Sequence, residues 1–442
     1  MAGHIYNELI ITFTDNNETG VIYEADITAE NIVEESMKLV QSINDENYLK
    51  FGGCIASEFS IDLLNTTDRR FSQSLVGRWI SVKLIQHTIS NRPIYPSNSL
   101  YPSDTLCPGY ELDVTTHYIF SGKIDSAKLN QEDLNVRTII AYDAMAILHA
   151  TDATNYVFQH LAQSSAFTIQ VAYDYALQNN GKIQISKYSG DNWEDEITKE
   201  SFDRDGNSTP PFQYVRDYFI KNDAWRQSSS TISYGELLKY CCEDLAAFGI
   251  IVPDGGKGSF KMITLKGNPI VYQYYEKLQP EEYVSTGYND YSFLTEGNSS
   301  GKTASAISGF PMATDGAVGK TYDFTKNPTI YDPSSGLGQS RTSTPFDRLI
   351  MTTSIGYRIA MNSENGDCAF DTYRPLKATV EGTHEQIVGS PITIIANKTN
   401  PDGSYVEENG VYVKEYINTY VFKRTLTGIQ ALTDEIETKG QR

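Results

Sequence analysis

The sequence predicts an α+β, β-rich protein with a β-sheet unit at each end of the chain and a smaller α/β region between them. The chain holds 30 Tyr against 3 Trp, and 12% of its residues are aromatic, which favours strands. Short apolar runs separated by turn clusters recur toward both ends, as in half-buried strands. A length of 442 residues exceeds what one hydrophobic core usually serves, so we expect several units.

Residues 1–155 are expected to form the first β unit. The runs YNELIITFT and VIYEADIT predict a hairpin whose turn contains Asn16, Asn17 and Gly20. The segment NIVEESMKLVQSIND fits helical and extended spacing equally, so its pattern does not decide. Further strands are predicted at FGGCIASEFSIDLL, WISVKLI, YIFSGKI and VRTIIAY, and AYDAMAILHA turns helical. Residues 87–116 contain four prolines and predict a surface insertion between two strands.

Residues 156–267 predict a helical, α+β middle unit. VFQHLAQSSAFTIQVAYDYALQNN has a helical pattern, and Tyr234 to Phe248 is the most amphipathic stretch of the chain, with Gly249 as its stop. IIVPDGGKGSFKMITL then predicts a strand, a Gly-rich turn and a strand. Residues 268–360 are rich in Gly, Ser, Thr and Tyr, and we expect irregular, partner-covered backbone with short strands there.

Residues 361–442 are expected to form the second β unit. Strands are predicted at RPLKATVEG, SPITIIAN, VYVKEY and YVFKRTLTG, and the segment ALTDEIETKG is predicted as a C-terminal helix. Six apolar residues near the end of the chain indicate that this end is anchored: Val421, Phe422, Leu426, Ile429, Leu432 and Ile436.

The charge and the cysteines exclude several classes of protein. A formal charge of -20 and a pI near 4.7 argue against a surface that grips phosphate, so we expect no specific nucleic-acid binding. Neither a signal-peptide pattern nor a run of about eighteen apolar residues occurs, so we expect no membrane insertion. The five cysteines predict reduced thiols because they are odd in number, scattered and without a CxxC pair: Cys54, Cys107, Cys241, Cys242 and Cys368.

We interpret none of the candidate sequence motifs as a catalytic, cofactor-binding or metal-binding site. The GKT at Gly301 to Thr303 has Glu296 where a phosphate loop needs glycine, and DGGKG at 254–258 fits a hairpin turn. The acidic residues around Trp193 imitate a glycosidase pair, but a solvated loop is the better interpretation. The histidines are dispersed without metal-ligand spacing: His4, His87, His117, His149, His160 and His384. We therefore expect no enzyme, no cofactor and no metal site.

Two parts of the chain carry a resemblance to a known family. YLKFGGCIASEFSIDLL, LVGRWISVKL and YIFSGKIDSAKLNQEDLNVRTIIAYDAMAIL resemble, in that order, the first domain of tail hub proteins of phages and phage-like particles of Gram-positive bacteria. PLKATVEG, QIVGSPITIIA and YVFKRTLTGIQALTDEIETKG resemble the closing domain of the same family. The insertion from His87 to Thr116 departs from the family, which has a short hairpin there.

This resemblance implies two tube-type β-barrel domains, at residues 1–155 and 361–442. It further implies a homotrimer at the distal end of a tail, in which three chains with two similar barrels each match a six-fold tube to a three-fold spike. The implied partners are the tail tube, distal tail or baseplate proteins, the spike or tail tip and the tape measure protein. The resemblance also implies a channel through which DNA can pass. The protein would be assembled in the host cytoplasm and released in the particle by lysis, either as part of a phage or of a tailocin-like particle.

Two other functions remain open from the residues. One is a receptor- or glycan-binding tail protein, in which tyrosine rings stack on sugars. The other is a cell-wall hydrolase, which would need a catalytic set that the sequence does not display. A glycan-binding assay and zymography on peptidoglycan separate these functions from a purely structural one.

Overall fold

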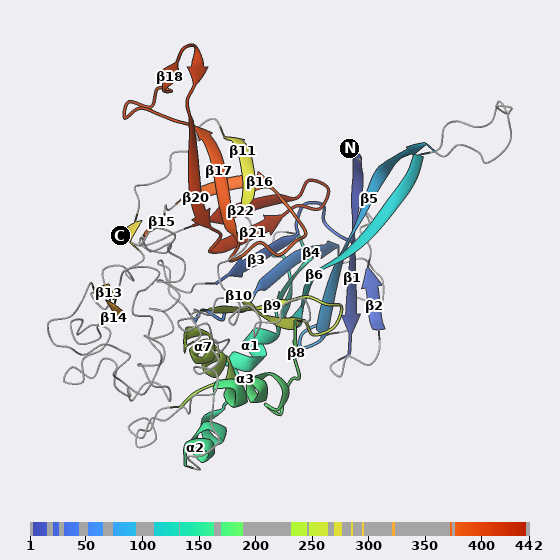
Figure 1. The fold of residues 1–442 in the computed structure, drawn as a ribbon. Coiled ribbons are helices and arrows are strands. Elements are labelled where there is room, and N and C mark those ends of the chain that lie inside the picture. Colours follow the sequence, from blue (N-terminus) through green and yellow to red (C-terminus); the bar gives the residue numbers. More distant parts are fainter. Residues whose placement is uncertain are drawn as a thin grey trace, which may run out of the picture.

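The computed structural model describes most of both ends of the chain and part of its middle (Figure 1). The described residues are 3–15, 21–25, 31–43, 52–64, 74–93, 110–131, 133–162, 169–188, 231–244, 247–263, 269–275, 284–285, 294–295, 321–322, 372–373 and 376–438. The GKT motif, the acidic group around Trp193, Cys107, Cys368 and most of the region 268–360 lie outside these residues.

The described chain is rich in strands and has few helices, which confirms the β-rich class. The strands of the N-terminal part are β1 Gly3–Thr14, β2 Val21–Ala25, β3 Lys38–Ser42, β4 Glu58–Leu64, β5 Trp79–Pro93, β6 Tyr110–Leu129 and β7 Val136–Tyr142. The middle part has α1 Ala144–His149, α2 Thr154–Ala162, α3 Ile169–Gln178, β8 Ser186–Lys187, α7 Tyr234–Asp244, β9 Phe248–Val252 and β10 Ser259–Ile263. These are followed by β11 Ile270–Tyr275, β12 Val284–Ser285, β13 Leu294–Thr295, β14 Thr321–Tyr322 and β15 Thr372–Tyr373. The C-terminal strands are β16 Lys377–Glu381, β17 Pro391–Asn397, β18 Glu407–Glu408, β19 Val411–Tyr412, β20 Lys414–Tyr420, β21 Lys423–Thr427 and β22 Thr433–Glu437.

A sheet of ten strands spans both ends of the sequence. Its order is β16-β22-β21-β3-β4-β7-β6-β5-β1-β2. Strands β3 and β21 pair in an antiparallel ladder from Lys38↔Thr427 to Ser42↔Lys423, so the two predicted β units share one sheet. In each of β3, β4, β21 and β22 the side chains alternate between buried and half-exposed, as expected for a sheet with one face on a core.

The predicted hairpin at the N-terminus is present as β1 and β2, with its turn outside the described residues. The predicted insertion at 87–116 is bounded by a long ladder, because β5 runs on to Pro93 and β6 begins at Tyr110. Figure 1 shows these two strands extending beyond the body of the sheet.

A second sheet, β11-β17-β20, lies beside the C-terminal end of the large sheet. After β20 the chain passes through Val421 and Phe422, both buried, and continues directly as β21 of the large sheet. The buried side chains of β16, β17, β20 and β22 belong to one hydrophobic core, which they share with α1, α3 and α7. A separate core lies under β1, β3–β7 and the turn after β21.

No sheet of the described residues closes into a barrel through a continuous ladder, and β2 and β16 are the outer strands of the large sheet. The two tube-type barrels therefore stay a prediction. The boundaries at 155, 267 and 360 stay predictions too, and the β3–β21 ladder crosses between the first and the last of these parts.

The predicted C-terminal helix is wrong. Residues Thr433–Glu437 form strand β22, which pairs with β16 on one side and with β21 on the other. Asp434 and Ile436 are buried at a two-residue period, which a helix does not give. Gly428, with φ 82°, turns the chain between β21 and β22, and a Cβ there would lie 2.3 Å from the carbonyl oxygen of Ala431.

The middle region holds the predicted helices, with changed ends. The stretch predicted as one helix from residue 157 contains α2 and α3, and α7 ends at Asp244. The predicted helix stop at Gly249 is wrong, because Gly249 lies inside β9, where a Cβ would come within 2.3 Å of the Phe260 ring. The predicted hairpin is present as β9 and β10, with DGGKG in its turn.

Candidate assembly site

The candidate functional site is the junction where the C-terminal strands complete the N-terminal β unit. Leu426 and Ile429 are fully buried in the core of the N-terminal β unit, although more than 380 residues separate them from β1–β3. The side chain of Leu426 lies opposite Leu39 across the β21–β3 ladder. At the end of this ladder the N–H of Ile43 donates to the carbonyl of Phe422 at 2.9 Å. The apolar anchors near the end of the chain therefore hold two distant segments together.

The amide of Gln430 bridges the gap between the turn after β21 and strand β1. The N–H of Asn7 donates to Gln430 Oε1 at 3.2 Å, and Gln430 Nε2 donates to the carbonyl of Asn7 at 2.6 Å. The side chain of Asn7, which is buried, donates to the carbonyl of Ile429 at 2.7 Å. A primary amide offers the same donor and acceptor pair as a backbone peptide, so Gln430 takes the place of a neighbouring strand here. Gln430 thus links β1 to the turn after β21, two segments of the large sheet that do not pair with each other as strands.

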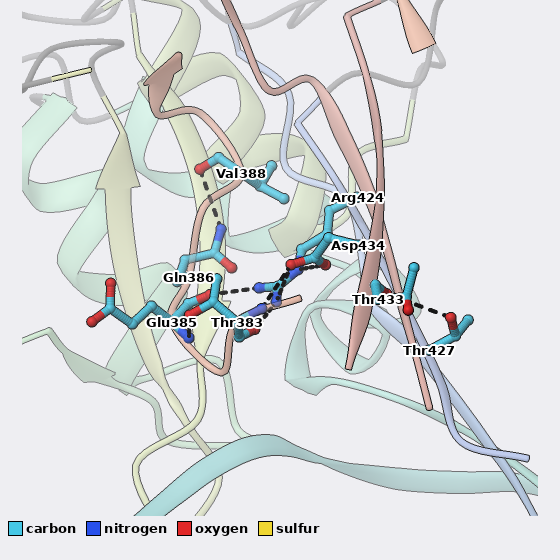
Figure 2. Close-up of polar contacts among 8 residues, drawn as sticks. All are labelled: Thr383, Glu385, Gln386, Val388, Arg424, Thr427, Thr433 and Asp434. Carbon is cyan, nitrogen blue, oxygen red and sulfur yellow. Dashed lines mark hydrogen bonds and ion pairs between the residues drawn. The ribbon is translucent and has the colours of Figure 1, made fainter. Parts of the chain in front are cut away.

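A buried ion pair fixes the loop between β16 and β17 to strands β21 and β22 (Figure 2). Arg424 Nε lies 2.6 Å from Asp434 Oδ1, and Arg424 Nη2 lies 3.1 Å from Asp434 Oδ2; both residues are almost completely buried. The same guanidinium donates to the carbonyl of Glu385 at 2.5 Å and to that of Thr383. Asp434 also accepts from the N–H of Thr383 at 3.0 Å. Burial raises the pKa of Asp434, and Arg424 works against that shift.

The loop held by Arg424 also contacts the long hairpin of the N-terminal unit. His384 of the loop stacks on His117 of β6, with ring centroids 3.4 Å apart. Burial lowers the pKa of both imidazoles below the ordinary value for histidine. For His384 the neighbouring His117 and Arg424 lower the pKa further, while Glu385 raises the pKa of both rings. The two rings stack most favourably when at least one is neutral.

The DGGKG turn attaches the middle region to the large sheet. Within the turn, Asp254 accepts from the N–H groups of Gly256 and Gly258, each at 3.2 Å. The carbonyl of Gly256 in turn accepts from Trp79 Nε1 at 3.2 Å and from the hydroxyl of Ser121. The N–H groups that would face phosphate in a nucleotide loop donate here to Asp254 within the turn, and the carbonyl of Gly256 ties the turn to β5 and β6.

An open pocket of about 520 Å³ beside α7 was not predicted from the sequence. It is lined by His149, Ala150, Asp152, Thr231, Ile232, Ser233 and Glu236. Glu236 accepts from the N–H of Ser233 at 2.8 Å and Ser233 Oγ accepts from the N–H of Glu236 at 3.1 Å, which forms a capping box. Asp152 accepts from the N–H of Thr154 at 2.9 Å at the start of α2. Both carboxylates of this pocket therefore satisfy helix ends.

Three cysteines and His149 of the described residues lie close together in the structure. Cys54, Cys241 and Cys242 are free and buried, with 3.7 Å between Cys54 Sγ and Cys242 Sγ. His149 Nε2 lies 2.7 Å from the carbonyl of Cys54. Among the described residues no three His, Cys, Asp or Glu side chains are placed to hold a metal ion. No helix in that part of the chain has the length and apolar character needed to cross a bilayer.

Comparisons with known proteins give weak structural similarities. No family model and no curated protein matches the chain. Among solved structures, the chain is similar to the 43 kDa tail protein of prophage MuSo2 from Shewanella oneidensis, with 9% identity, a TM-score of 0.41 and 98% of each chain covered. It is also similar to the E. coli c3393 protein, described as a component of the type VI secretion system with structural similarity to the T4 bacteriophage tail proteins gp27 and gp5. That match has 7% identity and a TM-score of 0.33, and covers 94% of this chain and 76% of the other.

Proposed function

We propose that this chain is a structural hub of the tail of a phage or phage-like particle. In this role three copies form a ring with pseudo-six-fold symmetry, which joins a hexameric tail tube to a three-fold spike or tail tip. Its other partners are distal tail or baseplate proteins and the tape measure protein, and the ring encloses a channel. The chain carries no catalytic activity in this proposal.

The observation that carries the proposal is the β3–β21 ladder. Through it, one sheet runs over two hydrophobic cores, one in each terminal β unit. The ladder and the hydrogen bonds between Gln430 and Asn7 hold the two units at a fixed relation, which a ring of alternating units requires. Three chains with two units each present six units to a tube, so a three-fold part can meet a six-fold part.

The outward face of the continuous sheet is suited to line a channel. The exposed Lys38 lies on this face among small or uncharged side chains on neighbouring strands: Val40, Ser60, Ile140, Thr425 and Thr427. On the same face, Glu435 pairs with Lys377 at 2.7 Å and Glu437 pairs with Lys423 at 3.0 Å. Glu58 and Asp62 lie on β4 beyond them. Lys377 and Lys423 are already paired and offer little grip to a polyanion, and the carboxylates of Glu58 and Asp62 repel it. Passing DNA would therefore be held weakly, even with Lys38 exposed on the same face.

Mass in solution combined with symmetry in electron micrographs tests this proposal. Sedimentation of the full chain should give a trimer, and two-dimensional class averages should show a three-fold ring with a central hole. A wild-type chain that forms no ring, or a ring without a hole, would overturn the proposal. Zymography on purified peptidoglycan should give no clearing, and clearing would revive a hydrolase function.

A further inference from the structure

We infer that an arm at residues 398–413 docks on a lysine-bearing surface of a second copy of this chain, so that the ring is held by exchanged arms. The inference rests on the proposed ring. It concerns which surfaces join the subunits, and neither terminal β unit supplies them.

The arm is an ordered projection between β17 and β20. Lys398 donates its N–H to the carbonyl of Val413 at 2.8 Å, and Val406 donates to that of Lys398 at 2.8 Å. The hairpin β18–β19 turns through Asn409 and Gly410, with φ values of 51° and 79°. Figure 1 shows β18 projecting away from both sheets. These hydrogen bonds lie within the arm, so its shape does not depend on the body of the subunit.

The arm presents apolar and acidic side chains together. Val411 is 67% exposed and Tyr412 is 48% exposed, and Tyr416 on the adjoining strand is 61% exposed. Glu407 and Glu408 are exposed beside them, opposite Tyr412 and Val411 in the hairpin register. Clustered aromatic and aliphatic side chains on a projection that the subunit's own core does not use are typical of a docking surface.

A second surface of the same chain complements this arm. In the middle region Lys187 of β8 pairs in register with Phe260 of β10, and the ammonium of the next residue, Lys261, lies 5.1 Å from the Tyr188 ring centre; Lys182 lies between α3 and β8. Lys187 pairs with Asp174 at 2.7 Å, while Lys182 is exposed. In a chain of net charge -20, few surfaces can receive two glutamates without repulsion. This lysine surface, around β8 and β10, is one of them.

The charges also decide the kind of contact. An isologous contact between two arms would bring two acidic hairpins together, which like charges disfavour, and as a two-fold contact it does not build a three-fold ring. Arm against lysine surface is a heterologous contact, which closes into a ring when the rotation allows. In Figure 1 the arm projects at the top and β8 lies in the lower half of the subunit, so one copy can use both surfaces at once.

Charge reversal and charge swap test the inference by sedimentation velocity on the full chain over a range of concentrations. The variant Glu407→Lys/Glu408→Lys should weaken trimer formation by on the order of tenfold or more. It also makes the net charge less negative, which alone would favour association, so a loss has the opposite sign to the general electrostatic effect. Lys182→Glu/Lys261→Glu should weaken the trimer too, and the four changes combined should restore it. Lys123→Glu/Lys128→Glu, at two exposed sites on β6, makes the same change in net charge as the lysine pair and should leave association within about twofold.

Each outcome decides. A ring that forms equally well with the reversed arm overturns this inference and leaves the proposed hub intact, since the arm would then face another protein. Weakening by both pairs of changes without rescue by the combination overturns the pairing of these two surfaces. A wild-type chain that stays monomeric at its highest soluble concentration overturns both the inference and the ring. Equal thermal unfolding curves for all variants show that folding is unaffected.

Discussion

Replacing Arg424 by methionine removes one half of the buried ion pair and should strongly destabilise the C-terminal β unit. Methionine keeps much of the length and apolar volume of arginine but has no charge and no donor. Asp434 then retains the N–H of Thr383 as a partner, and the carbonyls of Thr383 and Glu385 lose their donor. The loop between β16 and β17 is no longer tied to β21.

The expected cost follows from the burial of the pair. Asp434 is 0% exposed and Arg424 is 1% exposed, so the remaining carboxylate has no water to replace its partner. Removing one member of such a pair usually costs about 3–5 kcal/mol of unfolding free energy. The neighbouring pair Lys423–Glu437 lies on the outward face, with the Lys423 side chain 42% exposed. Lys423→Met should therefore cost no more than about 1 kcal/mol.

Urea denaturation followed by circular dichroism measures the two variants against the wild type. Limited proteolysis of the loop around Glu385 gives a local readout, and Arg424→Met should be cut faster there than Lys423→Met. An equal loss of unfolding free energy in the two variants would refute the reasoning, because it would mean that burial does not determine how much an ion pair contributes to stability. A loss below about 1 kcal/mol for Arg424→Met would refute it as well.

Three further predictions concern the pH response and the junction. His117 and His384 have lowered pKa values in the folded protein, so below about pH 6.5 the unfolded chain binds more protons than the folded one. The free energy of unfolding should therefore fall there as pH falls. Replacing both histidines by Phe should flatten this dependence in urea titrations at several pH values. Burial raises the pKa of Asp143 to about 7, so the stabilising contribution of this group should be complete below about pH 4 and lost as pH rises toward about 7. Relative to Asp143→Asn, the free energy of unfolding should fall by up to about 1.4 kcal/mol per pH unit over this range. Parallel pH slopes for the two proteins would contradict this. Gln430→Ala removes both hydrogen bonds to the backbone of Asn7 and should cost about 1–3 kcal/mol in the same assay, with faster amide exchange at Asn7 as the local readout.

The first β unit was largely predictable because its signals are local. Alternating apolar residues predicted β4 and the start of β5, and the segment AYDAMAILHA predicted α1. Asp143 accepts from the N–H of Met145 at 3.0 Å and so caps that helix. The two residues are only two positions apart, so a contact of this kind can be recognised in the sequence. The DGGKG turn was predicted for the same reason, although its attachment to Trp79 and Ser121 joins residues too distant for any pattern.

The second β unit was predicted less well because tertiary pairing overrides its local pattern. ALTDEIETKG has helical composition, but the ladders on both sides of β22 and the buried partner of Asp434 impose a strand. Arg424 appeared in the sequence as an ordinary polar position between apolar anchors. The stack of His117 on His384 and the amide bridge of Gln430 join residues more than 260 positions apart, so periodicity cannot indicate them.

The order in which a ribosome delivers this chain gives the β3–β21 ladder a further consequence. Ser42 and its neighbour in space Phe422 are 380 residues apart, which corresponds to about 20 to 80 seconds of translation. During that interval the N-terminal sheet lacks Leu426 and Ile429 from its core, and the edge of β3 that later pairs with β21 is unpaired. A nascent chain with such an open edge is prone to pair with another polypeptide, so holding chaperones should matter more for its yield than the final stability does.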